Sequence, residues 1–155
     1  MVDVAHKVET ERFARAQAYV HIPASLGEHL RDSNWVSSKG PVFHTAIIAG
    51  TMAAKNTAAL IPFCHSLNIS GVEITISLIN NKLIEIFASV KTRAQTGVEM
   101  EALSAASVAA LTIYDMCKSY SNNLVIGDIR LVKKTGGKCD YSWTGARGGP
   151  KLTDG

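Results

Sequence analysis

Thr96-Gly97-Val98-Glu99-Met100-Glu101-Ala102-Leu103, continuing to Thr112-Ile113-Tyr114-Asp115-Met116-Cys117-Lys118, predicts one long helix from about Met100 to Ser119. Residues three and four apart form an apolar stripe along it, made of Leu103, Ala106, Ala110, Ile113 and Cys117. Asp115 and Lys118 lie to one side of this stripe, three residues apart, where side chains on a helix can touch. The helix therefore combines a core-facing stripe with a charged pair near its end.

Alternating segments on both sides of this helix predict a sheet. Residues 14–22 place Ala, Val and Ile on one face and Arg15, Gln17, Tyr19 and His21 on the other, which is the period of a half-buried strand. Segments 72–78 and 82–90 flank Asn80-Asn81, whose side chains tolerate positive φ, and together they predict a hairpin. Residues 125–131 alternate again and predict a last strand.

The remaining elements complete the order β-α-α-β-β-α-β. A short helix is expected after Pro23, a polar, flexible loop over 33–41, and a helix over 42–61 that Pro62 stops. This order predicts an α+β domain of ferredoxin-like type, with an antiparallel sheet and helices on one face. The other sheet face is then available to a partner subunit. We expect residues 1–140 to form this single domain and residues 141–155 to form a mobile tail.

Composition limits the classes of function. The 155 residues are 46% hydrophobic and 19% charged, as in a globular domain. A net charge of +3 is too mild for nucleic-acid binding but suits a small anionic ligand. We expect no membrane association, because no apolar run approaches the roughly 18 residues of a span. The first seven residues lack the apolar core of a signal peptide, and the three widely spaced cysteines do not predict a disulfide framework or a zinc site. A cytoplasmic protein is therefore expected.

The charged residues of the long helix allow two interpretations. Asp115 and Lys118 form either an ordinary surface ion pair or an acid–base pair whose pKa values are tuned by each other. Glu99 and Glu101 either stabilise the first helical turn or contact a ligand. Glu101 and Asp115 are fourteen residues apart, about 21 Å along a helix. A site that uses both therefore needs a long substrate or a second subunit.

Two further segments could contribute to a site. His65 is either a hydrogen-bonded core residue or an acid–base group near neutral pH. A thiolate or metal site with Cys64 is disfavoured, because neighbours in an extended segment point in opposite directions. A basic loop, Lys133 to Lys138 around Gly136-Gly137, is either solvated or binds phosphates with Lys39 and Arg12. Its spacing does not match a P-loop.

Several motifs of the sequence resemble those of the MoaC family of cyclic pyranopterin monophosphate synthases. They are Met1-Val2-Asp3-Val4, Ala49-Gly50 with Ala53-Ala54-Lys55, Leu60-Ile61-Pro62 with Cys64-His65, Thr96 to Leu103, Leu111 to Lys118, and Lys134-Thr135-Gly136-Gly137-Lys138. They span nearly the whole chain in order. Phe63 and Ser66 depart from the family pattern, which usually has leucine and proline there.

The resemblance implies an activity and an assembly. The family converts 3′,8-cyclo-7,8-dihydroguanosine 5′-triphosphate into cyclic pyranopterin monophosphate and releases pyrophosphate. Its members are homohexamers, trimers of dimers, with a ferredoxin-like fold and active sites at the dimer interface. Carried over by motif, the catalytic pair is Asp115 and Lys118. The substrate contacts implied are Phe63, Cys64, His65, Met100 and Glu101, with Arg12, Lys39, Glu99 and Lys134 lining the pocket.

These inferences define two competing functions. The first is acid–base catalysis by Asp115 and Lys118, assisted by His65 or Glu101, with Lys39, Lys134 and Arg12 neutralising phosphates. No cofactor is required by this chemistry and no dedicated metal site is expected, but Mg²⁺ on the triphosphate is compatible with it. The second is a non-catalytic oligomer that binds a nucleotide or pterin for regulation. The two differ in whether the triphosphate is chemically changed.

Overall fold

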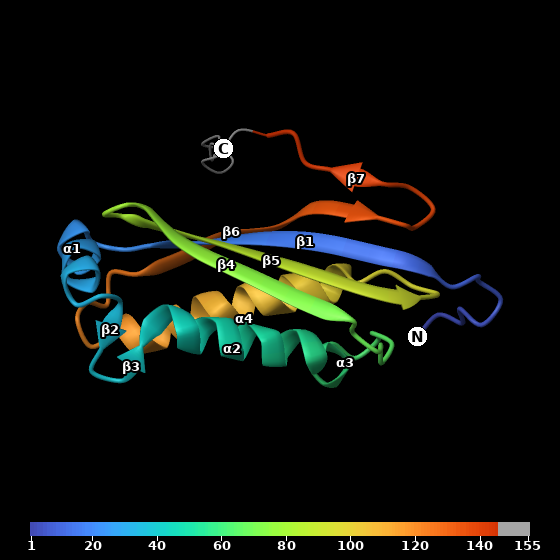
Figure 1. The fold of residues 1–155 in the computed structure, drawn as a ribbon, viewed down its shortest axis with the longest axis horizontal. Helices are drawn as coiled ribbons and strands as arrows, with labels where there is room; N and C mark the ends of the chain where they lie inside the picture. The colour runs from blue at the N-terminus through green and yellow to red at the C-terminus, as the bar shows by residue number, and fades with distance from the viewer. Residues whose placement is uncertain (146–155) are drawn as a thin grey trace, which may run out of the picture.

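A five-stranded antiparallel sheet with helices on one face forms the core of the computed structural model, which describes residues 1–145 (Figure 1). The elements in chain order are β1 (Thr10–His21), α1 (Ala24–Asp32), β2 (Val36–Ser37), β3 (Gly40–Pro41), α2 (Val42–Lys55), α3 (Thr57–Leu60), β4 (Gly71–Asn80), β5 (Leu83–Ala94), α4 (Glu99–Cys117), β6 (Val125–Thr135) and β7 (Tyr141–Ser142). The strand order is β4-β5-β1-β6-β7. The predicted α+β fold with an antiparallel sheet is confirmed.

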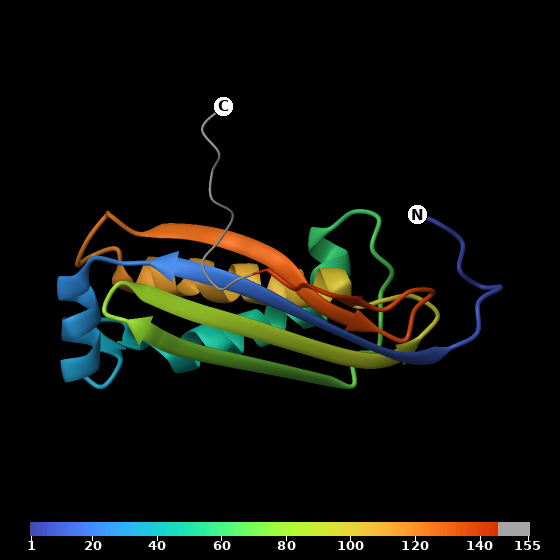
Figure 2. The same ribbon diagram turned by 90° about the horizontal axis from the view of Figure 1, so that it is seen from above.

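The alternation in β1 sets which side of the sheet is the core. Ala14, Ala16, Ala18 and Val20 are fully buried, and β1 pairs with β5 in an unbroken register from Thr10–Ala94 to His21–Leu83. The matching residues of β5 are also fully buried, so the two central strands present one continuous apolar face. Helices α2 and α4 cover this face, and within residues 1–145 no helix covers the opposite face (Figure 2).

The side chains on the opposite face of the sheet are more buried than the alternation of apolar and polar residues predicts. Gln17 and Tyr19 keep only 3% and 2% of their surface exposed. The Tyr19 hydroxyl donates to the Glu85 carboxylate over 3.0 Å, and the Arg15 guanidinium lies over the Phe87 ring at 4.2 Å. Long side chains from neighbouring strands therefore bury each other on this face without a helical layer.

The stripe that packs α4 on the sheet is made largely of small residues. All five alanines of α4 are fully buried, with Ile113 and Cys117, whereas Leu103 lies at the edge and is half-buried. Small side chains let α2 approach closely: a Cβ on Gly50 would lie 2.8 Å from the Ala105 carbonyl oxygen. Glycine at this position therefore fixes the spacing between the two helices.

Two predicted segments differ in detail from the structure. The helix expected over 42–61 is divided at Asn56, whose φ of −110° is not helical. The Asn56 and Thr57 side chains donate to carbonyls of the preceding turn, which closes α2 there. The loop expected over 33–41 contains the short hairpin β2–β3.

The end of the chain is described only in part. Tyr141–Ser142 pair with β6 as β7, and the Arg130 guanidinium lies 4.5 Å from the centre of the Trp143 ring. Residues 146–155 of the tail expected over 141–155 lie outside the described residues. Among residues 1–145, no helix combines the length and apolar character needed to cross a membrane.

Candidate active site

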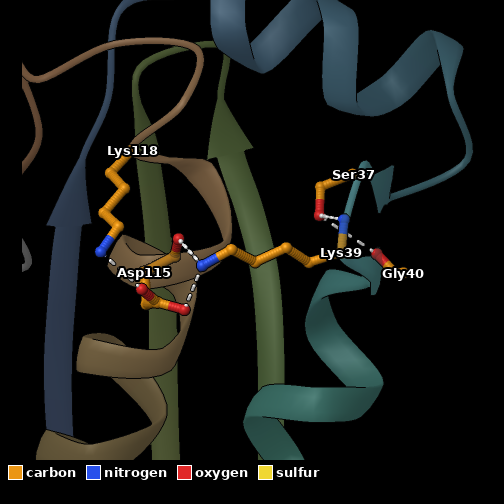
Figure 3. A network of polar contacts seen from close by, with 5 residues as sticks. All are labelled: Ser37, Lys39, Gly40, Asp115 and Lys118. Carbon is orange, nitrogen blue, oxygen red and sulfur yellow. Dashed lines mark hydrogen bonds and ion pairs between the residues drawn. The ribbon is translucent and has the colours of Figure 1, made fainter.

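A three-residue ion cluster lies at the C-terminal end of α4. The Lys39 ammonium contacts Asp115 Oδ2 at 2.6 Å and the Lys118 ammonium contacts Oδ1 at 2.8 Å, so each carboxylate oxygen holds one lysine (Figure 3). Lys39 also donates to the Asp115 backbone carbonyl over 3.1 Å. About half of each side chain is exposed to solvent. The structure thus adds Lys39 to the pair of Asp115 and Lys118, which the sequence predicted on one helix.

The β2–β3 hairpin carries Lys39 to this position. Gly40 follows it with φ of +108°, a conformation that side-chain-bearing residues rarely adopt. The Ser37 hydroxyl accepts from the Lys39 backbone N–H over 3.2 Å and donates to the Gly40 carbonyl over 3.3 Å (Figure 3). The tight turn therefore orients the lysine side chain across to α4.

The two lysines change the protonation of Asp115. Its pKa is lowered from 3.8 to about 2, first by the hydrogen bond from Lys118 and then by that from Lys39. The pKa of Lys118 is raised, mainly by the same hydrogen bond. At neutral pH the cluster therefore holds one carboxylate between two ammonium groups. Asp115 in this state is a weak base that holds the lysines in place.

A second cluster of predicted residues surrounds the N-terminal end of α4. Glu101 is 4% exposed, and burial, together with the nearby charge of Glu99, raises the pKa of its carboxyl. Cys64 lies near enough that Glu101 adds to the burial that raises the pKa of its thiol. Both shifts favour the neutral forms. This end of the helix thus has a buried carboxyl beside a partly buried thiol, unlike the exposed ion cluster at the other end.

The segment Phe63–His65 joins this second cluster. His65 Nε2 lies 2.9 Å from the Val2 carbonyl oxygen, which requires Nε2 to carry the proton. His65 and Glu101 line the same hollow of about 200 Å³. Phe63 and Met100 are 76% and 37% exposed. The apolar side chains therefore present a surface beside the enclosed groups.

The basic residues at this end do not form one phosphate loop. Lys134 lies 3.1 Å from Glu99 as an ion pair, and Arg12 donates to the backbone carbonyls of Ala94 and Gln95. Lys133 alternates with Lys134 along β6 and so points to the other face of the sheet. Lys134 and Arg12 thus lie with the Glu99–Glu101 end of α4.

The predicted residues therefore form two clusters separated by the length of α4. Lys39, Asp115 and Lys118 lie at one end, whereas Glu101 lies fourteen residues away, about 21 Å along the axis. Within the described part of the chain, no group of three or more His, Cys, Asp and Glu residues could hold a metal ion.

Sequence reasoning assigned no role to one lysine at the second cluster. Lys55 ends α2 and lines the hollow that contains His65 and Glu101. Lys55 belongs to the motif Ala53-Ala54-Lys55, which resembles the family, but no spacing rule relates residue 55 to residue 101. Only the packing of α2 against α4 brings the two together.

An α+β domain with a carboxylate held between two lysines at one end of a helix, and a buried carboxyl at the other end, fits the class of small enzymes that act on anionic substrates. The chain is a member of the MoaC family, whose sequence model matches residues 1–137.

Relatives support this membership over most of the chain. It is 49% identical over 140 residues to the cyclic pyranopterin monophosphate synthase of Xanthomonas campestris pv. campestris, covering 90% of this chain and 85% of that protein. It is 50% identical over 141 residues to the synthase of Desulfitobacterium hafniense, covering 91% and 85%. It is 51% identical over 148 residues to a molybdenum cofactor biosynthesis bifunctional protein of Synechocystis sp., covering 93% of this chain but 43% of that longer protein.

Proposed function

We propose that this chain converts (8S)-3′,8-cyclo-7,8-dihydroguanosine 5′-triphosphate into cyclic pyranopterin monophosphate and pyrophosphate, an early step of molybdenum cofactor biosynthesis. The observation that carries this proposal is about 50% identity, over nine-tenths of the chain, to proteins named cyclic pyranopterin monophosphate synthase. The two charged clusters on α4 supply groups suited to the required chemistry.

Proton transfer is the task proposed for the Lys39–Asp115–Lys118 cluster. The reaction opens the imidazole-derived ring and closes the pterin ring, and both steps move protons. Because Asp115 is ionised at neutral pH, its role is to hold and charge-balance the lysines. Lys118, which its hydrogen bond to Asp115 keeps protonated, is the proposed proton donor. His65 and Glu101 assist from the other cluster.

Charge neutralisation is the second task proposed for the cations of the site. In the last step the oxygen of a sugar hydroxyl bonds to the α-phosphorus, the bond from the α-phosphorus to the bridging oxygen breaks, and pyrophosphate leaves with the proton that the hydroxyl gives up. Negative charge on the leaving group is stabilised by nearby cations, here Lys39, Lys134 and Arg12. Phe63, Cys64, Met100 and Glu99 line the pocket. No cofactor is proposed, and Mg²⁺ bound to the triphosphate is compatible with these residues.

One active site is proposed to combine opposite ends of α4 from two subunits. A two-fold axis that reverses α4 would bring the Glu101 end of one chain to the Asp115 end of another. Exposed apolar side chains on the helical face, Ile48, Met52 and Leu111, suit such a contact. The assembly proposed is a cytoplasmic homohexamer, a trimer of dimers.

Mass spectrometry of the triphosphate after incubation with the protein tests this function. Release of pyrophosphate with a cyclic monophosphate product is expected. Binding of the triphosphate without chemical change would replace the enzyme with the regulatory oligomer that binds a nucleotide or pterin. No binding and no turnover would exclude both functions.

A further inference from the structure

Lys55 is a charged residue that the proposed chemistry leaves unused. It lies in the last turn of α2, and its exposed ammonium forms no hydrogen bond or ion pair with any residue in the range 1–145. Lysine is a strong hydrogen-bond donor and carries no acceptor. The ammonium is therefore free to contact a ligand.

The surroundings of Lys55 are concave on two sides. It lines the hollow of about 200 Å³ with His65 and Glu101, and it also lines an adjoining hollow of about 400 Å³ beside the start of β4. Leu67 and Ile69 are common to both. Lys55 thus stands at the border of two hollows, one of which ends on a buried carboxyl.

The first hollow offers a donor beside an acceptor. Lys55 can only donate, whereas the Glu101 carboxyl, when it is ionised, can only accept. The Glu101 carboxyl accepts a hydrogen bond from its own backbone N–H but has no cationic partner among the described ion pairs, so it keeps acceptor capacity for donors on a ligand. A ligand that fits has an acceptor and one or two N–H donors along one edge.

A guanine-derived six-membered ring has this edge. Its carbonyl oxygen accepts, while its ring N–H and its exocyclic amino group donate. Lysine and arginine commonly donate to this carbonyl oxygen of guanine. An adenine-derived ring has an amino donor at the same position, which would face the ammonium without a hydrogen bond.

We propose that Lys55 is a specificity-determining residue that donates to the carbonyl oxygen of the substrate's guanine-derived ring while Glu101 accepts from the N–H groups of the same edge. This inference rests on the proposed function and adds the orientation of the substrate. The base edge enters the hollow between α2 and the start of α4, and the phosphates extend toward the cations outside it.

Equilibrium binding of GTP and ATP to the assembled full-length chain tests this role. The unchanged protein is expected to prefer GTP. Lys55→Met should weaken GTP binding roughly 10- to 100-fold, the discrimination that a good base contact provides, and leave ATP binding within about twofold. Lys55→Arg keeps a donor and should retain most of the preference. Lys82→Met, at the far hairpin turn of β4 and β5, is the matched control and should change neither affinity.

Three results would overturn the inference. They are an unchanged protein with no preference for GTP, a Lys55→Met variant that keeps the preference, and an equal loss of both nucleotides, which would assign Lys55 to the phosphates. Product analysis on the unchanged protein separates this inference from the function. If product forms but Lys55→Met keeps the preference, only the role of Lys55 fails. If no product forms, the proposed function fails whatever GTP binding shows.

Discussion

Asp115 should remain ionised well below the pH at which an ordinary aspartate takes up a proton. The contacts of 2.8 Å to Lys118 and 2.6 Å to Lys39 lower its pKa from 3.8 to about 2. Replacing both lysines by methionine removes these contacts and should return the pKa to near 3.8. At pH 3 the carboxyl should then be about nine-tenths ionised in the unchanged protein but only about one-seventh ionised in the double variant.

Carbon-13 NMR of labelled aspartate carboxyls measures this difference directly. An Asp115→Asn sample identifies the resonance, and each sample is checked for a folded spectrum at pH 3 before it is compared. Lys118→Met alone should raise the pKa more than Lys39→Met alone, because the hydrogen bond from Lys118 is the largest contribution. Lys82→Met and Lys55→Met keep the cluster intact and serve as controls.

The reasoning fails if Asp115 is mostly protonated at pH 3 in the unchanged protein, or if it stays mostly ionised in the double variant. The first result would mean that the lysines do not hold the carboxylate in solution. The second would mean that some other group lowers its pKa. Either result would remove the basis for treating Asp115 as the residue that positions Lys118.

Three further predictions concern activity and stability. Asp115→Asn should lower the rate of product formation by roughly 10²- to 10⁴-fold without changing assembly, because Lys118 loses its partner. Asp32→Asn, at an exposed position, is the control and should be fully active. A fully active Asp115→Asn would refute the catalytic role of Asp115. Because burial raises the pKa of Glu101, stability from this group is present below about pH 4.5 and is lost as the pH rises through the raised value. The urea midpoint of unfolding of Glu101→Gln should therefore exceed that of the unchanged protein by more at pH 8 than at pH 4. An equal difference at both pH values would contradict the raised pKa of Glu101. Gly50→Val places a Cβ 2.6 Å from Ile74 Cδ1 and 2.8 Å from the Ala105 oxygen, so it should cost about 1–3 kcal/mol and lower Tm by about 2–4 °C per kcal/mol. Val8→Ala, at an exposed position before β1, is the control and should leave Tm unchanged.

Local patterns were sufficient to predict the elements that carry the site. The spacing of Ala106, Ala110 and Ile113 predicted α4, and alternation in β1 predicted its core face, because both signals depend only on neighbours in the chain. The break at Asn56 was missed, because side-chain bonds to carbonyls of the previous turn leave no clear mark in an apolar run. The burial of Tyr19 was missed for a different reason: it depends on Glu85, sixty-six residues away.

The site itself could be predicted only where its residues share one element. Asp115 and Lys118 are helical neighbours, so their contact followed from spacing. The contacts of Lys39 with Asp115, and of Lys55 with the hollow of Glu101, join residues from separate elements. They arise from the antiparallel packing of α2 on α4, which no local pattern specifies. The separation of Glu101 from Asp115, in contrast, followed from helix length and led to the proposal of a shared site.

Mixing two inactive variants is the most direct test that one active site combines both ends of α4 from different subunits. Lys118→Ala and Glu101→Ala are each expected to form almost no cyclic monophosphate product. After the two are dissociated together and reassembled at equal amounts, half of the dimers contain one chain of each kind, and each such dimer has one site with both native residues. The mixture should therefore recover about a quarter of the activity of the unchanged protein. Mass spectrometry that confirms mixed assemblies, together with no recovery of product, would contradict the shared site.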